Sequence, residues 1–170
     1  IGFDYYNLPS TDGSIYWSEG VSYEFHLKQI EQLEDAANEL HQMCLQVAAR
    51  IIQSGDYPDY FQIPQTAIPS IEYSWKGKAP MLYGRFDFAY DGQNIKMLEY
   101  NADTPTGLLE ASVAQWHWIE EVQNVPHRDQ FNSIHEDLIE RWKQLFAPKS
   151  LVHFAACQEA GREDWGNLEY

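Results

Sequence analysis

Polar side chains that could hold a metal-bound nucleotide alternate with apolar ones in two neighbouring segments of the chain. Arg85 and Asp87 are two residues apart in the first segment, and Glu99 and Asn101 are spaced in the same way in the second. Because successive side chains of a strand point to opposite faces, each pair predicts two polar groups on one face. Carboxylate and amide oxygens favour Mg²⁺ or Mn²⁺ over zinc, and a guanidinium beside them can stabilise a phosphoryl group during transfer. The pattern therefore predicts a magnesium-nucleotide site.

The connection between the two segments decides whether the polar pairs meet. A hairpin centred on Gln93 places Asp87 directly opposite Glu99, whereas a tight two-residue turn at Asp91-Gly92, which local signals favour, places them on opposite faces. The metal site therefore requires a loop of three or five residues. Two carboxylates facing each other across a sheet repel, and a shared divalent cation would remove that penalty.

An exposed structural hairpin is the alternative interpretation, because alternating strands with solvated charges are common. The arginine favours the functional interpretation, since a solvated face has no need to combine a guanidinium with two carboxylates and an amide.

Composition narrows the classes of function. The 170 residues carry a formal net charge of -15, which argues against binding to nucleic acid or to an anionic membrane surface. Hydrophobic residues make up 44% of the chain and aromatic residues 15%, as expected for a globular protein, and no run approaches the length of a membrane span. Cys44 and Cys157 each lie in an apolar context, which predicts buried thiols in a reduced, cytoplasmic protein.

Periodicity and breaker residues divide the chain into elements. Between residues 56 and 80 the prolines allow only turns and one brief helix. The other expected elements are a long helix over about 22–54 ending at Gly55, the hairpin within 81–103, helices over about 108–121 and 128–146, a buried parallel strand over 151–157, and the approach to a further helix over 161–170.

These elements predict an α/β fold of mixed α+β character, in which a long helix and an antiparallel hairpin precede the start of a parallel sheet. Residues 1–146 would form one part that carries the site, and residues 147–170 would begin an incomplete α/β unit. A lone parallel strand needs neighbours on its edges, so we expect the chain to be a portion of a larger protein.

Two strings of residues carry a resemblance to a known family. Tyr-Gly-Arg-Phe-Asp-Phe from Tyr83, and Leu-Glu-Tyr-Asn-Ala-Asp-Thr-Pro-Thr-Gly-Leu-Leu-Glu-Ala from Leu98, closely resemble the glutathionylspermidine synthetase family, including its single-function bacterial acid–amine ligases. The resemblance implies an ATP-grasp ligase that activates a carboxylate as an acyl phosphate and transfers it to an amine. It places the ATP-clamping lysines beyond residue 170.

The family pattern also implies roles for individual residues. Arg85 would bind ATP and stabilise the phosphoryl-transfer transition state, and the main chain of Arg85, Phe86 and Asp87 would contact the nucleotide. Asp87, Glu99 and Asn101 would be the magnesium ligands. The same four side chains emerge from the spacing of the polar residues.

Three further residues are candidates for substrate binding. Thr104 and Thr106 stand where the family places serine hydroxyls, which implies binding of an acid such as glutathione or a peptide. Glu110 could receive an amine, such as a polyamine, although an acidic residue in a first helical turn is also favoured by the helix dipole. Two other functions remain open, namely a catalytically idle relative that serves as a binding or assembly module, and a carboxylate-metal hydrolase.

Overall fold

The computed structural model describes residues 3, 5–7, 13–123, 125, 128–156 and 162–170, in which the chain forms two compact units. One unit is Phe25–Tyr100, and the other combines Ile1–Glu24 with Asn101–Tyr170. Helices and one two-stranded antiparallel sheet make up the regular structure of the described residues, which confirms the predicted mixed α/β class.

Helix α1, Leu27–Ser54, is the longest element of the unit Phe25–Tyr100. At its start, the backbone N–H of His26 donates to Oε1 of Gln29 over 2.9 Å, which satisfies an amide at the helix end. At its end, Gly55 has φ +69° and donates its N–H to the carbonyl of Ile51 over 3.0 Å. Glycine adopts this left-handed conformation without strain. The helix predicted over 22–54 is therefore confirmed, with a later start.

The proline-rich segment that follows contains the turns and the one brief helix that the sequence predicts. A single 3₁₀ turn, η1, spans Asp59–Phe61, and helix α2 spans Ile68–Lys76 with Pro69 in its first turn. Proline is tolerated there because the first N–H groups of a helix have no partner within it.

Strands β1, Arg85–Tyr90, and β2, Ile95–Asn101, form the predicted hairpin. Residues 91–94 connect them, so the loop has four residues rather than three or five. The carboxylate of Asp91 accepts hydrogen bonds from the side chain of Asn94 and from the backbone N–H groups of Asn94 and Gln93, at 2.9, 2.7 and 2.9 Å. These bonds lower the pKa of Asp91 to about 2. The length differs from prediction because this side chain closes the turn across Asp91 to Asn94.

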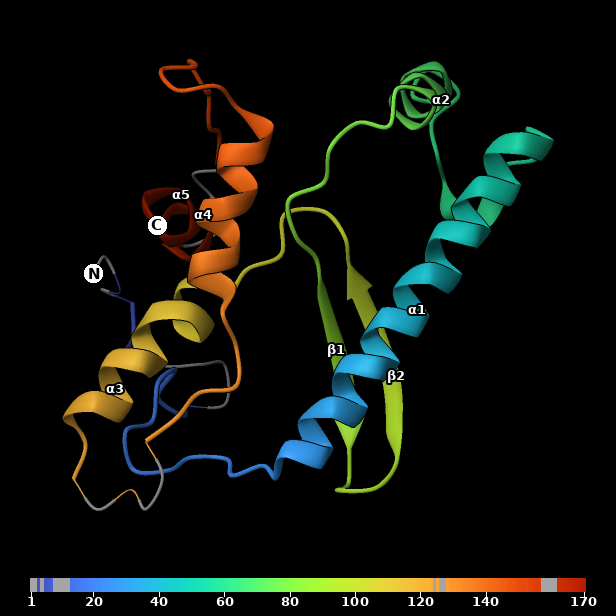
Figure 1. Ribbon diagram of the computed structural model, residues 1–170. Helices are drawn as coiled ribbons and strands as arrows, with labels where there is room; N and C mark the ends of the chain where they lie inside the picture. The colour runs from blue at the N-terminus through green and yellow to red at the C-terminus, as the bar shows by residue number, and fades with distance from the viewer. Residues whose placement is uncertain (1–2, 4, 8–12, 124, 126–127, 157–161) are drawn as a thin grey trace. The chain divides into compact units, whose positions relative to one another are not determined.

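Helix α1 lies along the hairpin, as Figure 1 shows. Phe25 stacks on Tyr90 with ring centroids 6.4 Å apart, and His41 contacts the ring of Tyr100 edge-on. All residues from Phe25 to Tyr100 are described, and none is fully buried. Helix α1 therefore packs on the hairpin as a thin layer, in a unit that also contains η1 and α2.

The second unit holds the fully buried residues of the described chain. A π-helix, η2, spans Glu110–Ala114 and continues directly into α3, Gln115–Glu121. The helix predicted over 108–121 is thus confirmed, but its π-helical turn was not foreseen. Leu109 is 1% exposed and Tyr5 is 2% exposed, which makes them the least exposed hydrophobic residues of this core among those described.

Two more helices complete this unit. Helix α4 is Ile134–Leu145 and helix α5 is Arg162–Glu169, so both predicted helices are present. Helix α4 begins later than predicted because the side chain of Asn132 forms hydrogen bonds before the helix starts. Its Nδ2 donates to the carbonyl of Ala111 over 3.1 Å, and its Oδ1 accepts the N–H of Ile134 over 3.3 Å.

The strand predicted over 151–157 is wrong for residues 151–156, which have no regular structure. Leu151 is 82% exposed and Phe154 is 59% exposed. An apolar run becomes a buried strand only when neighbouring strands pair with its edges, and none does so here among the described residues. Cys157 lies outside those residues, and Cys44 is a free thiol that is only partly buried.

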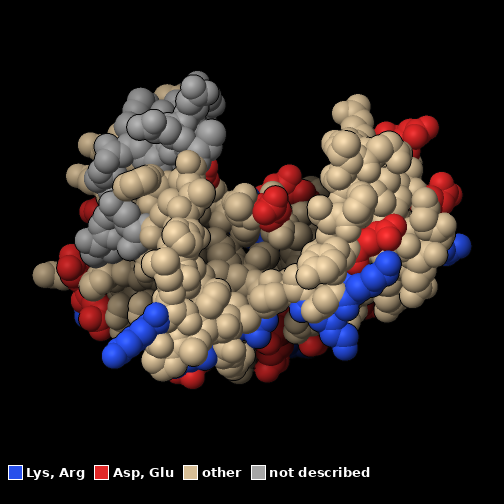
Figure 2. Space-filling view, turned by 90° about the horizontal axis from the view of Figure 1, so that it is seen from above, with Lys and Arg blue, Asp and Glu red and all other residues tan. Residues whose placement is uncertain are grey.

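The surface and the helices add two findings about charge and hydropathy. On the face shown in Figure 2, acidic and basic side chains form small groups of both signs separated by uncharged residues. Within the described ranges, no helix combines the length and the apolar character that crossing a bilayer requires.

Candidate functional site

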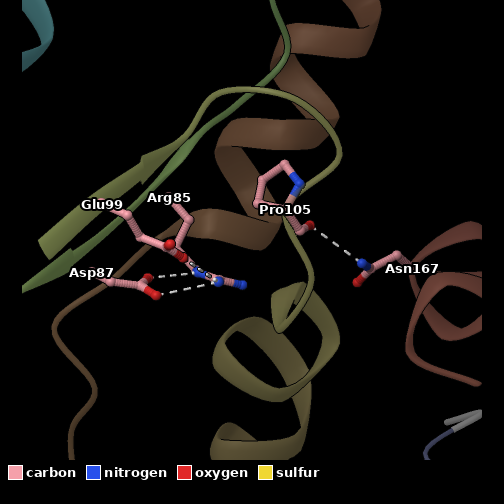
Figure 3. A network of polar contacts seen from close by, with 5 residues as sticks. All are labelled: Arg85, Asp87, Glu99, Pro105 and Asn167. Atoms are coloured by element: carbon pink, nitrogen blue, oxygen red, sulfur yellow. Dashed lines mark hydrogen bonds and ion pairs between the residues drawn. The ribbon is translucent and has the colours of Figure 1, made fainter. Parts of the chain in front are cut away.

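Three of the predicted site residues meet on one face of the hairpin. Nε of Arg85 donates to Oδ1 of Asp87 over 2.9 Å, and Nη2 donates to Oδ2 over 3.4 Å. The same Nη2 lies 4.0 Å from Oε1 of Glu99 on the neighbouring strand. Figure 3 shows the guanidinium beside both carboxylates. The positive charge of Arg85 therefore interacts with one carboxylate on each of the two strands.

The opposite face of the hairpin explains why these side chains converge. Phe86 stacks on Tyr100 across the strands, with centroids 3.9 Å apart and planes 12° apart, and on Phe88 along its own strand at 5.6 Å. With the aromatic rings on one face, strand alternation directs Arg85 and Glu99 to the other. Arg85, Asp87 and Glu99 therefore share one face, as a hairpin centred on Gln93 predicts, although the loop has four residues. Asn101, two residues after Glu99, ends β2.

The electrostatics of the cluster are those of a solvated ion pair. The hydrogen bond from Arg85 is the main cause that lowers the pKa of Asp87, and the positive charge of the guanidinium adds to this effect. The side chains of Arg85, Asp87 and Glu99 are 40%, 38% and 57% exposed. Pairs this exposed contribute at most about 1 kcal/mol to stability. The cluster can therefore rearrange around a ligand at little cost.

The donor set decides which metal these residues could hold. No group of three or more His, Cys, Asp or Glu side chains suited to a metal ion occurs among the described residues. Two carboxylates and an amide oxygen nevertheless fit Mg²⁺, which is usually held by one or two carboxylates with waters and substrate phosphates in its other positions. In the structure, Arg85 supplies the positive charge that the sequence assigned to a shared cation.

The candidate residues for substrate binding belong to the other unit. Thr104 is exposed and has φ +45°, and Thr106 is partly buried. Between them, the carbonyl of Pro105 accepts a hydrogen bond of 3.3 Å from Nδ2 of Asn167 in α5, which is drawn in Figure 3. The loop that carries both hydroxyls is therefore tied to the last helix.

Glu110 opens the π-helix and binds two tyrosines from the start of the chain. The hydroxyl of Tyr5 donates to its Oε1 over 3.0 Å, and the hydroxyl of Tyr16 donates to the same oxygen over 2.6 Å. Glu110 thus has partners that a solvated residue of a first helical turn lacks.

Several of these contacts were missed by reasoning from the sequence. Ala37 and Cys44 are apolar residues one turn before and one turn after His41 in α1, and this position is a signal that its ring faces the packed side of the helix. Its Nδ1 lies 2.8 Å from the hydroxyl of Tyr100. Tyr5 and Glu110 are 105 residues apart, and no local pattern could have paired them.

Comparison with known proteins agrees with the resemblance seen in the sequence. The chain matches, over residues 1–170, the family described as glutathionylspermidine synthase preATP-grasp. It is 56% identical over 172 residues to a protein of Haemophilus influenzae named "Putative acid--amine ligase", and the match covers 100% of this chain and 44% of that protein.

More distant relatives match a shorter part of the chain. The glutathionylspermidine synthase of Crithidia fasciculata is 35% identical over 100 residues, which is 56% of this chain and 14% of that protein. The bifunctional glutathionylspermidine synthetase/amidase of Escherichia coli K12 is 33% identical over 92 residues, which is 54% of this chain and 15% of that protein.

These relatives are named as ligases, synthases or synthetases, so the class of this chain is a family of ligase type. The chain belongs to the glutathionylspermidine synthase preATP-grasp family. It spans less than half the length of the curated relatives it matches.

Proposed function

We propose that this chain forms part of an ATP-dependent ligase that joins a carboxylic acid to an amine through an acyl phosphate. The observation that carries the proposal is the cluster of Arg85, Asp87 and Glu99 on one face of the hairpin. It combines a phosphate-binding cation with metal-binding oxygens, as phosphoryl transfer requires. The names of the relatives, acid–amine ligase and glutathionylspermidine synthase, support the class of reaction.

The reaction has two steps. An oxygen of the substrate carboxylate attacks the γ-phosphorus of ATP, the bond between that phosphorus and the bridging oxygen breaks, and ADP leaves with the electron pair. The amine nitrogen then attacks the acyl carbon, a C–N bond forms, and the C–O bond to phosphate breaks. Inorganic phosphate leaves with that electron pair, and the nitrogen loses a proton.

The residues of the hairpin have separate roles in the first step. Arg85 binds the transferring phosphoryl group and neutralises the charge that develops on its oxygens. Asp87, Glu99 and Asn101 are the side chains that would hold Mg²⁺, and the main chain of Arg85, Phe86 and Asp87 borders the nucleotide. When bound, the ion supplies charge neutralisation of the phosphates.

The arrangement of charge favours this role over a hydrolase. A metal-dependent hydrolase needs a general base beside its activated water. Both carboxylates of the cluster instead contact Arg85, which suits the handling of phosphate.

The substrates are small molecules in this proposal. The hydroxyls of Thr104 and Thr106 bind the acid, of which glutathione or another peptide is the candidate, and Glu110 contributes to binding the amine, of which a polyamine is the candidate. The enzyme acts in the cytoplasm, where ATP is available.

Substitution of Arg85 by alanine in the full-length protein tests the proposal. We expect Mg²⁺-dependent ATP turnover to fall about 10³- to 10⁵-fold, because an arginine that stabilises the phosphoryl-transfer transition state contributes that much. Arg50→Ala, at an exposed position of α1 in the same unit, is the matched control and should leave turnover unchanged. An unchanged rate in Arg85→Ala would refute the role of this arginine, and wild-type protein without any turnover would favour the idle binding module.

A further inference from the structure

Helix α1 meets strand β2 at a polar contact between two rings. Nδ1 of His41 lies 2.8 Å from the hydroxyl oxygen of Tyr100, and the imidazole contacts the phenol ring edge-on with centroids 5.9 Å apart. Both side chains are partly buried. Either group can donate in this hydrogen bond, according to the tautomer of the imidazole. The bond is directional, so it fixes the position of the tyrosine ring against the helix.

The same tyrosine is held from strand β1 as well. Its ring stacks on Phe86 with centroids 3.9 Å apart and planes 12° apart. Such close, nearly parallel packing restricts how far either ring can slide. Tyr100 therefore has one partner on the helix and one on the neighbouring strand, and it links α1 to both strands of the hairpin.

The residues beside Tyr100 in the sequence are candidate metal ligands. Glu99 and Asn101 flank it in β2, and their side chains point to the face opposite the tyrosine ring because side chains alternate along a strand. Phe86 likewise separates the other two residues of the site in β1. A displacement of the backbone at Tyr100 would therefore carry both candidate ligands of β2 with it.

The surrounding packing gives the ligands little other support. All residues of the unit Phe25–Tyr100 are described, and none of them is fully buried. The charged cluster adds little rigidity, because its side chains are partly exposed and such pairs contribute little free energy. A binding site is precise only when neighbouring contacts hold its side chains in position. In this unit, that task depends on individual directional contacts.

We propose that His41 is a positioning residue, which holds the magnesium ligands of β2 in place through the hydroxyl of Tyr100. The imidazole touches neither metal nor nucleotide, and it acts only through the tyrosine. Groups that orient the ligands of a metal ion strongly affect its affinity. This role rests on the proposed ligase function, and it adds to the site a residue of α1 that neither the alternation of the strands nor the family resemblance assigns.

Positioning and simple packing have different consequences. A contact that only packs contributes to the free energy of unfolding, and its loss leaves the affinity of the folded protein for metal unchanged. A contact that positions ligands also affects metal affinity, because ligands that are not held in place must be ordered when the ion binds. The affinity of the folded protein for a metal–nucleotide complex therefore distinguishes the two roles.

Electron paramagnetic resonance of Mn²⁺ with the full-length protein tests the proposal without turnover. The probe is the complex of Mn²⁺ with a non-hydrolysable ATP analogue. His41→Phe keeps an aromatic ring and removes the hydrogen bond, and it should raise the Kd of this complex about three- to tenfold, the equivalent of one net hydrogen bond. His41→Asn should restore most of the affinity, because its amide branches at the same carbon as the imidazole and can replace Nδ1.

Two control substitutions should leave the Kd unchanged. Gln42→Ala alters the exposed residue that follows His41 in α1. Tyr90→Phe removes another hydroxyl of the hairpin, one that is buried and has no partner in the described part of the chain. Circular dichroism identifies which variants are folded at the temperature of the measurement.

A double-mutant cycle shows whether the two residues act through one contact. Tyr100→Phe keeps the stacking on Phe86 and removes the hydroxyl, so it should raise the Kd by the same factor as His41→Phe. The double variant should raise the Kd no further. Effects that multiply in the double variant would overturn the proposal, since the two residues would then act independently. Tyr100→Phe, the milder change, gives the deciding value if His41→Phe fails to fold.

The outcomes separate the role of His41 from the proposed function. If the wild-type protein binds the complex and turns over ATP while folded His41→Phe and Tyr100→Phe keep the wild-type Kd, the positioning role is refuted and the ligase proposal stands. If the wild-type protein does not bind the complex of Mn²⁺ and nucleotide, the proposed metal site is refuted and the role of His41 falls with it.

Discussion

The guanidinium of Arg85 contacts two carboxylates that would otherwise repel each other across the hairpin. The sequence predicted that a shared cation offsets the repulsion between these carboxylates, and in the structure the guanidinium of the arginine supplies that positive charge. Since the same side chain is proposed to bind phosphate, the arginine would exchange carboxylate partners for phosphate oxygens when a nucleotide binds. Because these side chains are partly exposed, the exchange costs little free energy.

Titration of Asp87 by NMR tests this pairing. Its pKa should lie below the ordinary value of 3.8, because Arg85 donates to the ionised carboxylate. The folded-state pKa of Asp87 then lies below its unfolded-state pKa. The pairing with Arg85 therefore stabilises the protein at pH values above the ordinary pKa, and this stabilisation is lost as the pH falls through the lowered pKa. Arg85→Ala should return the pKa of Asp87 toward its ordinary value. Asp91, whose pKa of about 2 is set by its own loop, should not respond. A simultaneous change at both residues would mean that the hairpin had unfolded.

The backbone of Thr104 gives a second prediction at this scale. A β-branched residue at φ +45° is strained, since this conformation costs such residues on the order of 1–3 kcal/mol. Thr104→Gly should therefore raise the free energy of unfolding, by about 1 kcal/mol after the greater chain entropy of glycine is subtracted. It should also weaken binding of the acid substrate, because the hydroxyl is gone. Thr104→Ser keeps the hydroxyl and should keep the affinity. Urea denaturation that shows a loss of stability in Thr104→Gly would contradict the assignment of strain.

At the scale of elements, strand β2 joins the core of its unit to the site. Glu99 and Asn101 flank Tyr100, whose ring faces away from them onto Phe86 and whose hydroxyl meets His41 of α1. Burial is the main cause that raises the pKa of this tyrosine, and the nearby thiol of Cys44 contributes. The packing of α1 therefore fixes the strand that carries two of the candidate metal ligands.

Two tyrosines of the hairpin provide a matched test of this packing. Tyr100→Phe removes a hydrogen-bonded hydroxyl and should lower the free energy of unfolding by about 0.5–1.5 kcal/mol. Tyr90→Phe removes a hydroxyl that is buried and has no partner in the described part of the chain, so it should leave stability equal or higher. Urea denaturation of both variants decides the point. If Tyr90→Phe costs as much as Tyr100→Phe, the hydrogen bond to His41 does not anchor the strand.

The elements differ in how far the sequence could predict them. The stripe of α1 and the alternation of the hairpin are local patterns, and both were found. The shared face of Arg85, Asp87 and Glu99 followed from alternation and register, although the length of the loop did not, since Asp91 closes it with side-chain hydrogen bonds. The strand was mispredicted over residues 151–156, because a buried strand depends on neighbours that no local pattern reveals.

At the scale of the whole molecule, the two units differ in their packing. The unit Phe25–Tyr100 carries the charged cluster and has no fully buried residue, whereas the fully buried described residues, such as Tyr5 and Leu109, lie in the other unit. The carboxylate of Glu110 belongs to that second unit, and its partners come from the start of the chain. The contacts around Glu110 join residues that are far apart in the sequence. The spacing of residues therefore could not predict them.

Paramagnetic broadening by Mn²⁺ in the presence of ATP is the measurement that tests the central claim most directly. Mn²⁺ replaces Mg²⁺ at oxygen sites, so in the full-length protein it should selectively broaden the NMR signals of residues 85–87 and 99–101. The loop 91–94 at the far end of the hairpin should be broadened less, because the effect falls steeply with distance, and Glu99→Gln should abolish the selective effect. Strong broadening at the loop or elsewhere, with the signals of Asp87 and Glu99 unaffected, would contradict the account.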